Sequence, residues 1–300
     1  MSENAENEKK AKVIRIKTKP YIVTSGAFHL KDIDTRDKQG LKKEDGKALL
    51  RRNREQMFEW QEKLYAENRQ SLLIVFQAMD AAGKDGCIKH VMRGLNPQGT
   101  HVTAFKQPSS EELDHDYMWR INRALPRRGE IGIFNRSHYE EVIVTQLHNL
   151  IADQQYPEDV IDKHVWENRY SQIRNWEEYL VEQGYHILKF FLHISKDEQR
   201  ERLLDRIEEE DKNWKFSAGD LAEREHWDEY QSLYQEAIRE TATKNAPWIV
   251  VPADRKWFAR AVVSQVVLET LEDMNPKMPE LSKEEIRELD HWREVLNNDK

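Results

Sequence analysis

The sequence predicts an α/β protein with a parallel sheet of five strands that helices cover on both faces. Five apolar segments of strand length occur along the chain, at residues 72–77, 101–105, 130–134, 185–194 and 247–251. Segments in which apolar residues recur every three or four positions separate them, as in amphipathic helices. Because strands and helices alternate, the strands are expected to run parallel. The first strand, LLIVFQ, supports this, since a continuous apolar run is typical of a strand buried on both faces.

The predicted helices lie at residues 47–68, 111–124, 138–149, 162–182, 196–210, 220–243 and 255–274. In the segment 162–182, large apolar side chains recur at helical spacing: Trp166, Tyr170, Ile173, Trp176 and Leu180. Such a stripe is far more often core packing than a ligand site, and we interpret it as core. In a sheet of this type, ligands bind where loops leave the carboxyl ends of the strands.

The chain is expected to contain one main domain with an extension at each end. Residues 1–45 are polar and predict a flexible or surface-wrapping arm. Residues 46–275 hold the alternating pattern, with a helical lid at about 195–225, and residues 276–300 predict a charged helical tail. No internal repeat or low-complexity linker divides the pattern.

Composition excludes several classes of protein. The net charge of −8 argues against a general nucleic-acid binder, although a local basic groove for a polyanion remains compatible with it. The one cysteine, Cys87, rules out an intramolecular disulfide and fits a reducing compartment. The N-terminus has no apolar core of a signal peptide, and no run is long enough to cross a bilayer. We therefore expect a cytoplasmic protein without membrane or nucleic-acid partners.

A loop typical of phosphate binding follows the first strand. Residues 78–86, AMDAAGKDG, are called the phosphate loop here. Small residues let backbone N–H groups approach an anion, and Lys84 supplies a positive charge. The usual first glycine is Ala78, and the usual hydroxyl after the lysine is Asp85. A carboxylate in such a cradle repels phosphate unless a metal lies between them, so Asp80 is a predicted metal ligand. The predicted phosphate contacts are Ala81, Ala82, Gly83, Lys84, Asp85 and Gly86.

A second polar cluster follows the strand 130–134. Residues 135–140, NRSHYE, are called the strand-end turn. It lies where phosphate-loop enzymes usually carry a metal-binding acid, and here that position holds the neutral Asn135. The forked donors of Arg136 suit phosphoryl oxygens. Ser137 could equally serve as a helix cap. Glu140 is a second predicted metal ligand.

The segment after the fourth strand predicts a lid. Arg202 and Arg206 are four residues apart and share one helical face, and Lys212 and Lys215 alternate with aromatic residues. A basic segment that folds over a bound phosphate chain and excludes water would have this composition. A solvated charged helix is the alternative for such a charge run.

These motifs together resemble the polyphosphate kinase 2 family. The segments QAMDAAGKDGCIKHVM, GEIGIFNRSHYEEV, DKNWKFSAGDLAER and APWIVVPADRKWF carry the likeness, which extends from about residue 30 to about residue 275. The FNRS sequence is most similar to the class III branch. Cys87 is at a position where relatives commonly have Thr.

The resemblance implies a three-layer fold similar to thymidylate kinases, with a phosphate loop and a helical lid. It implies Mg²⁺-dependent transfer of the terminal phosphoryl group of inorganic polyphosphate to adenine nucleotides, AMP and ADP, or the reverse, with Mn²⁺ and guanine nucleotides as alternatives. It also implies a homo-oligomer, a dimer or a tetramer. Carried over by position, the catalytic residues are Asp80, Lys84, Asn135 and Arg136. Further phosphate contacts are expected from Lys89, Arg93, Arg202, Arg206, Lys212 and Lys215.

Two rival functions stay open at this point. A nucleoside monophosphate kinase that uses ATP would share the fold, and the missing glycine and hydroxyl of the loop argue against it. A catalytically silent sensor of nucleotides or polyphosphate is favoured by Asn135 in place of an acid. The nucleotide base has candidate contacts by location alone: Phe105, Lys106 and the Asn96-Pro97 loop.

Overall fold

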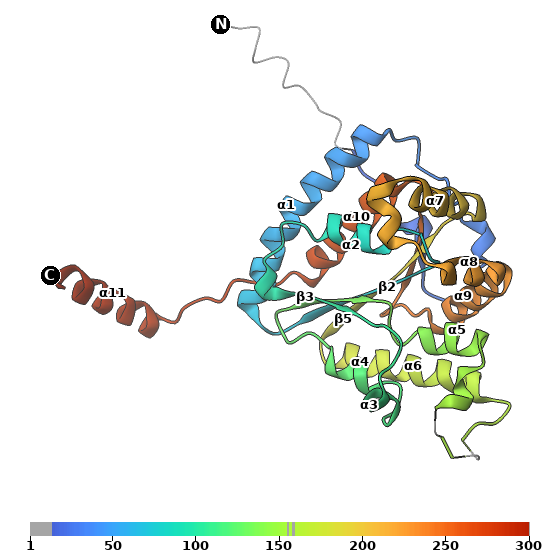
Figure 1. Ribbon diagram of the computed structural model, residues 1–300. Helices are drawn as coiled ribbons and strands as arrows, with labels where there is room; N and C mark the ends of the chain where they lie inside the picture. The colour runs from blue at the N-terminus through green and yellow to red at the C-terminus, as the bar shows by residue number, and fades with distance from the viewer. Residues whose placement is uncertain (1–13, 155, 158–159, 300) are drawn as a thin grey trace, which may run out of the picture.

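The computed structural model describes residues 14–154, 156–157 and 160–299 (Figure 1). Within them the chain forms a sheet of six strands in the order β1-β6-β5-β2-β4-β3. The strands are β1 (Ile22–Val23), β2 (Ser71–Ala78), β3 (Thr100–Ala104), β4 (Ile131–Asn135), β5 (Tyr185–His193) and β6 (Trp248–Pro252). Strands β2 to β6 run parallel, and β1 is antiparallel to β6. All five predicted strands are present. The predicted count misses β1, which is too short for its pattern to be recognised.

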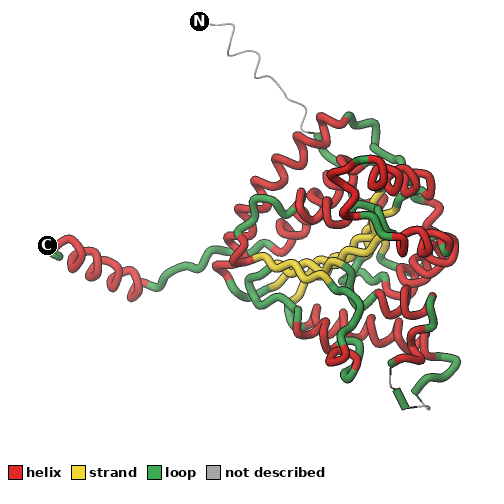
Figure 2. The backbone as a smooth tube through the Cα atoms, in the orientation of Figure 1, coloured by secondary structure: helices red, strands yellow, loops and turns green. Residues whose placement is uncertain are grey.

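The sheet lies between two layers of helices (Figures 1 and 2). On one face α1 (Lys43–Glu67), α2 (Lys84–Val91) and α10 (Lys256–Met274) pack together. On the other face α5 (Glu140–Leu147) and α6 (Val165–Glu182) pack together and against α9 (Trp227–Thr241). The other helices are α3 (Ser110–Leu113), α4 (Trp119–Arg123), α7 (Lys196–Glu208), α8 (Ala218–Glu225) and α11 (Lys283–Asn298). The short 3₁₀ helices are η1 (Lys19–Tyr21), η2 (Leu30–Asp32), η3 (Pro97–Gly99), η4 (Leu150–Asp153) and η5 (Glu210–Lys215).

Two predicted helices are each divided in the structure. The segment 111–124 forms α3 and α4, because the side chain of Asp116 accepts a hydrogen bond from the backbone N–H of Met118 at 2.9 Å. Such a local bond offers the backbone an alternative to helix. The segment 220–243 forms α8 and α9, which meet at His226, where ψ is 24°.

The two ends of the described chain differ in their packing. Ile16, Tyr21 and Val23 are buried, and β1 extends the sheet beside β6, so the described part of the N-terminal arm lies against the main body. At the other end, α11 extends away from the body at the end of an extended linker (Figure 1). Its side chains are exposed along its whole length.

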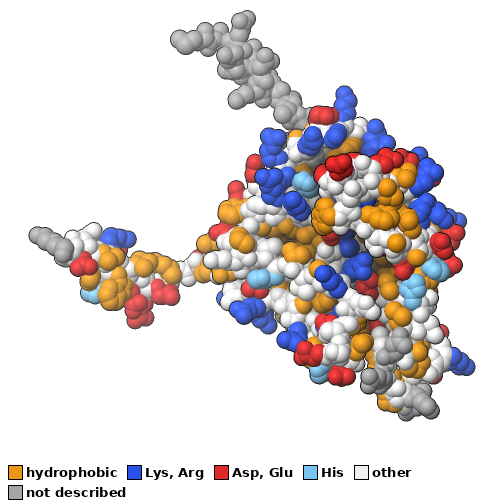
Figure 3. All heavy atoms as spheres, in the orientation of Figure 1, with side chains coloured by type: hydrophobic (Ala, Val, Ile, Leu, Met, Phe, Trp, Pro, Cys, Tyr) orange, Lys and Arg blue, Asp and Glu red, His pale blue; other side chains and the backbone are white. Residues whose placement is uncertain are grey.

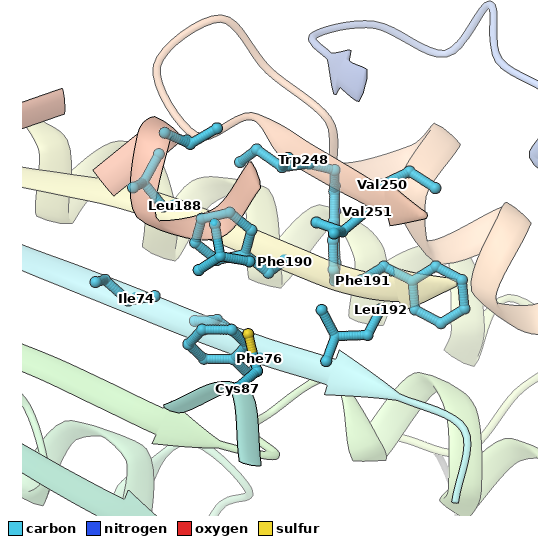
Figure 4. Close-up of a cluster of buried hydrophobic side chains, with 14 of the residues drawn as sticks. Ile74, Phe76, Cys87, Leu188, Phe190, Phe191, Leu192, Trp248, Val250 and Val251 are labelled. Atoms are coloured by element: carbon cyan, nitrogen blue, oxygen red, sulfur yellow. The ribbon is translucent and has the colours of Figure 1, made fainter. Parts of the chain in front are cut away.

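The core is built around the central strands. The rings of Phe76 on β2 and Phe190 on β5 stack with centroids 5.1 Å apart. Cys87 is buried against this cluster (Figure 4). Burial raises the pKa of its thiol to about 12, so it is a packing residue and not a nucleophile.

A buried ion pair lies beneath the strand-end turn. The Lys189 amine donates to Glu177 Oε2 at 2.6 Å, to the Thr241 carbonyl at 2.8 Å and to the Tyr139 hydroxyl at 3.2 Å. Burial alone would raise the pKa of Glu177, but Lys189 and His138 outweigh it and lower this pKa. The Tyr139 hydroxyl also donates to Glu177 at 2.8 Å. This network fixes Tyr139, and with it one end of the strand-end turn.

Candidate active site

The phosphate loop leads the chain from β2 into α2. Ala81 (φ 61°) and Gly83 (φ 96°) both adopt left-handed backbone conformations, which cost a residue with a side chain about 1–2 kcal/mol. The N–H of Ala82 donates to the Met79 carbonyl at 3.1 Å, so the predicted phosphate contact of Ala82 is not available through this group. The first N–H groups of α2 have no acceptor within the helix. The loop therefore presents a helix N-terminus beside Lys84.

The strand-end turn lies next to the phosphate loop because β4 pairs with β2. Asn135 is in register with Phe76, and the Arg136 N–H donates to the Phe76 carbonyl at 3.1 Å. The Lys84 amine donates to Asn135 Oδ1 at 2.5 Å. Asn135 Nδ2 in turn donates to Asp85 Oδ1 at 2.8 Å. Asn135 thus bridges the lysine and the aspartate of the loop.

The charges of Asp80 and Arg136 face each other across the site. Their closest atoms, Oδ1 and Nη2, are 3.4 Å apart. Burial raises the pKa of Asp80 although Arg136 opposes the shift, and burial also raises the pKa of Glu140. Burial and the nearby Arg136 lower the pKa of Lys84. The site therefore holds ionisable groups whose charges the protein only partly compensates.

The residues present fit a hard cation shared with a substrate. Among the residues that the structure describes, no cluster of three or more His, Cys, Asp or Glu side chains could hold a metal by itself. Two partly buried carboxylates with raised pKa values, Asp80 and Glu140, would gain from a divalent cation. Mg²⁺ is commonly bound by one or two carboxylates, with phosphate oxygens and water completing the shell. The donor set thus matches Mg²⁺ in a complex with phosphate.

A cavity of 730 Å³ opens beside the strand-end turn. Its volume is within the range of small-molecule sites, about 300–1,000 Å³. Arg136 and Glu140 lie in its wall, and Arg120 covers the ring of Phe105 with 5.5 Å between guanidinium and ring centroid. Phe105 and Lys106, predicted by location, line it. Residues that sequence reasoning missed also line it: Glu112, Tyr117, Arg120, Thr145, His148, Tyr156 and Glu223. They come from four different helices and the turns between them, and they share no common motif.

The four predicted lid cations differ in orientation. The guanidinium of Arg202 is buried and bonded to loop carbonyls, so the predicted phosphate contact of Arg202 is wrong. Arg206 pairs with Asp220 on α8, and Lys212 pairs with Glu209 at 2.5 Å. The Lys215 amine lies 5.0 Å from the Trp214 ring centroid. Arg202 and Arg206 point differently because α7 contacts the phosphate loop on one side and η5 and α8 on the other.

Basic side chains gather along α2, beyond the phosphate loop. Lys89 and Arg93 are exposed there. Burial lowers the pKa of His90, and the nearby charges of Arg260, Arg54, Lys89 and Arg93 lower it further. Figure 3 shows Lys and Arg side chains beside α1 and α2 on this side of the molecule. Arg54 and Arg260 were not predicted, because they belong to helices far from the loop in sequence.

A mostly parallel sheet, a loop of phosphate-binding type at the end of its central strand and a neighbouring Asn-Arg turn are the arrangement typical of phosphate-loop phosphotransferases. The model of the family described as polyphosphate kinase 2 (PPK2) matches residues 40–279 of this chain. The chain therefore belongs to the polyphosphate kinase 2 family and is a phosphotransferase of the polyphosphate–nucleotide class.

Individual relatives agree with this assignment. The chain is 49% identical over 256 residues to the ADP-polyphosphate phosphotransferase of Rhodopseudomonas palustris, covering 85% of this chain and 89% of the relative. It is 46% identical over 262 residues to the AMP/ADP-polyphosphate phosphotransferase of Meiothermus ruber, covering 85% and 92%. The crystal structure of polyphosphate kinase 2 from Arthrobacter aurescens TC1 superposes with a TM-score of 0.83 at 40% identity, covering 92% of this chain and 99% of that one. Within its described residues, the chain has no helix that is both long and apolar enough to span a bilayer.

Proposed function

We propose that this chain transfers the terminal phosphoryl group of inorganic polyphosphate to AMP and to ADP, reversibly and with Mg²⁺. The observation that carries the proposal is the contact between the phosphate loop and the strand-end turn beside a cavity large enough for a nucleotide. Two relatives whose names specify ADP and AMP/ADP as acceptors support the choice of nucleotide. The FNRS sequence at 134–137, similar to the class III branch, supports the use of both.

The proposed chemistry is an in-line displacement at phosphorus. An oxygen of the nucleotide's terminal phosphate forms a new bond to the terminal phosphorus of polyphosphate. The bridging P–O bond breaks, and its electron pair stays on the shortened polyphosphate. Lys84 and Arg136 lie where they can neutralise the charge spread over the transferring oxygens. No strong base is required because the attacking phosphate oxygen is already ionised. His138 is therefore given no role as a base. Its ring is buried, and burial lowers its pKa.

Asp80 and Glu140 are the proposed residues for Mg²⁺. When bound, the metal supplies positive charge to the phosphate oxygens and fixes their orientation. The raised pKa values of both carboxyl groups support this role, since ionised carboxylates at these positions lack full compensation within the protein. Mn²⁺ prefers similar oxygen ligands and is the proposed substitute.

The two substrates are proposed to approach from different directions. The nucleotide would occupy the cavity, with its phosphates toward Arg136 and its base near Phe105 and Lys106. Polyphosphate would run along the basic side of α2, past Lys89 and Arg93. Once the lid closes, Arg206, Lys212 and Lys215 are the proposed lid contacts to polyphosphate. We further propose the thymidylate-kinase-like arrangement of loop and lid, a homo-oligomeric state and a cytoplasmic location.

One assay tests the proposal and its two rivals. The purified protein is mixed with Mg²⁺, ADP and long-chain polyphosphate, and ATP is measured by luminescence. AMP replaces ADP in a parallel reaction, with ADP and ATP separated by chromatography. We expect ATP from ADP, ADP from AMP, and no product when EDTA removes the metal.

The other outcomes would overturn the proposal in distinct ways. ADP formed from AMP plus ATP, without any use of polyphosphate, would identify a nucleoside monophosphate kinase. Turnover of neither donor, with retained binding of nucleotide or polyphosphate in calorimetry, would identify a silent sensor.

A further inference from the structure

The inner face of α7 contacts the phosphate loop through two buried polar side chains. Gln199 and Arg202 are 1% and 5% exposed, respectively. Both bond to backbone carbonyl groups of the loop, and neither points into the cavity beside the strand-end turn. A lid helix thus contributes to the loop without facing the substrate.

All five N–H donors of the Arg202 guanidinium have a partner within the protein. Nη1 donates to the carbonyls of Ala82 at 2.6 Å and Ala81 at 3.2 Å. Nη2 donates to the carbonyls of Ala253 at 2.6 Å and Asp254 at 3.2 Å, at the end of β6. Nε donates to Glu198 at 2.7 Å, which compensates the charge. An arginine with every donor used in this way has none left for a phosphate oxygen.

Gln199 is bonded at both ends of its amide. Its Nε2 donates to the Asp80 carbonyl at 3.0 Å. Its Oε1 accepts from Arg224 Nη1 on α8 at 2.7 Å, and the same nitrogen also reaches the Lys196 carbonyl at 2.9 Å. Gln199 therefore joins the lid helix α8 to the residue proposed to hold the metal.

These contacts determine which way the peptide groups of the loop face. The carbonyls of three successive residues, 80 to 82, are all directed toward α7. In a trans peptide the N–H points away from the carbonyl, so the N–H groups of residues 81 and 83 are directed to the other side, where an anion would sit. The left-handed backbone of Ala81 is unfavourable and needs such external support to persist.

We propose that Arg202 and Gln199 are positioning residues that hold the phosphate loop in its anion-binding conformation, and that Gln199 couples this conformation to the lid through Arg224. The inference rests on the proposed function for its kinetic consequences only. The expectation from sequence, that Arg202 contacts phosphate directly, is the competing explanation.

Arg202→Lys separates the two explanations because it keeps the charge and removes the fork. A lysine cannot reach carbonyls of both the loop and β6, so the positioning role predicts that kcat falls about 10²-fold through misplacement of the loop. The KM for the nucleotide should change less than about threefold. The nucleotide binds in the separate cavity, and the substitution removes none of its contacts there. The matched control is Arg200→Lys, which should behave like the wild type. Arg200 is an exposed arginine on the same helix, and its side-chain partner among the described residues is Glu201. Activity of Arg202→Lys within threefold of the wild type would overturn the proposal.

A measurement without substrate keeps the inference separate from the proposed function. Deuterium exchange of peptides covering residues 79–86 should be faster in Arg202→Lys than in the wild type and unchanged in Arg200→Lys. If exchange in these peptides is unchanged in Arg202→Lys, the positioning role is wrong whatever the activity. If exchange increases while the wild type transfers no phosphate, the positioning role stands and the proposed function fails.

The coupling to the lid is tested by a double-mutant cycle. Gln199→Met removes both ends of the connection, and Arg224→Met removes the lid end alone. If Arg224 acts on the loop through Gln199, the double variant loses no more kcat than Gln199→Met does. Losses that multiply would show independent action and overturn the coupling.

Discussion

Lys189 and Lys84 both bond to the strand-end turn, and they differ in how much of their hydrogen-bonding capacity the protein uses. Lys189 is fully buried, and its three donors go to Glu177, Tyr139 and the Thr241 carbonyl. Lys84 has one hydrogen-bond partner among the described residues, the neutral Asn135. Lys189 is part of a closed network, whereas Lys84 keeps donors and charge available for a group from outside the protein.

The arginines repeat this difference. Arg202 uses all five donors within the protein, and Arg136 makes one long contact of 3.4 Å with Asp80. A cation that the fold fully satisfies supports structure, and a cation held at a site with spare donors supports chemistry. Substitutions at the two kinds of position should therefore separate activity from stability.

Lys84→Ala should have the largest effect, and on activity alone. Removing one charged donor from the transferring phosphate should lower the rate of ATP formation from ADP and polyphosphate about 10³-fold or more. Unfolding in urea should change little, since the protein itself makes limited use of this amine. Lys283→Ala on the exposed helix α11 serves as the control. Activity within tenfold of the wild type would place the reacting phosphate elsewhere.

Lys189→Met should act on stability instead. It leaves the Glu177 carboxylate buried without its partner, which typically costs about 3–5 kcal/mol of unfolding free energy. The midpoint and slope of urea unfolding measure this. Replacing Glu177 by Gln in the same variant should recover part of the loss, because no buried charge remains. A destabilisation below about 1 kcal/mol, the worth of a surface pair, would show that the network is not closed.

Asp80→Asn should reduce activity and increase stability together. Loss of the proposed metal carboxylate should lower kcat about 10²-fold and weaken the dependence on Mg²⁺. Burial raises the pKa of Asp80, so the fold disfavours the ionised carboxylate and its removal should raise the free energy of unfolding at pH 7. Asp273→Asn, at an exposed position on α10, is the control. Lowered stability in Asp80→Asn would mean that this carboxylate supports the folded structure, as Lys189 and Arg202 do.

The smallest effect concerns pH. Burial lowers the pKa of His193 to about 4, from an unfolded value of 6.5. Between these values the unfolded chain binds a proton that the folded chain does not, so stability falls as pH decreases from 6.5 toward 4. His193 should account for a loss of about 2 kcal/mol between pH 7 and pH 5. Urea unfolding of His193→Gln at both pH values should show a pH dependence smaller by this amount. A pH dependence equal to that of the wild type would show that the pKa of His193 is not lowered in the folded protein.

Much of the fold could be predicted from local sequence patterns. The five parallel strands were recognisable because strand-like segments alternate with helical ones along the chain, although β3, THVTA, is largely exposed. Strand β1 was not recognisable, since two residues form no pattern, and its place in the sheet depends on pairing with β6 across more than two hundred residues. The division between α3 and α4 was missed because the apolar spacing over residues 111–124 gives no sign of the local hydrogen bond from the Met118 N–H to the Asp116 side chain.

The motifs of the site were visible in the sequence, and their contacts were not. Asp80, Lys84, Asn135 and Arg136 stand at the ends of two strands that the structure places side by side. The cavity residues Tyr117 and Arg120 lay outside every motif, and Glu223, although it lies within DKNWKFSAGDLAER, had no predicted role. Helical spacing placed Arg202 and Arg206 on one face, but spacing does not tell which neighbour each side chain meets.

By itself the sequence determined the strands, the phosphate loop, the Asn-Arg turn and the family, because these depend on residues close together along the chain. Only the tertiary structure decided that Asn135 bridges Lys84 to Asp85 and that Arg202 turns away from the cavity. Each of these contacts joins residues 50 to 121 positions apart. A hydrogen bond over such a separation is set by how strands and helices pack, and local periodicity carries no information about it.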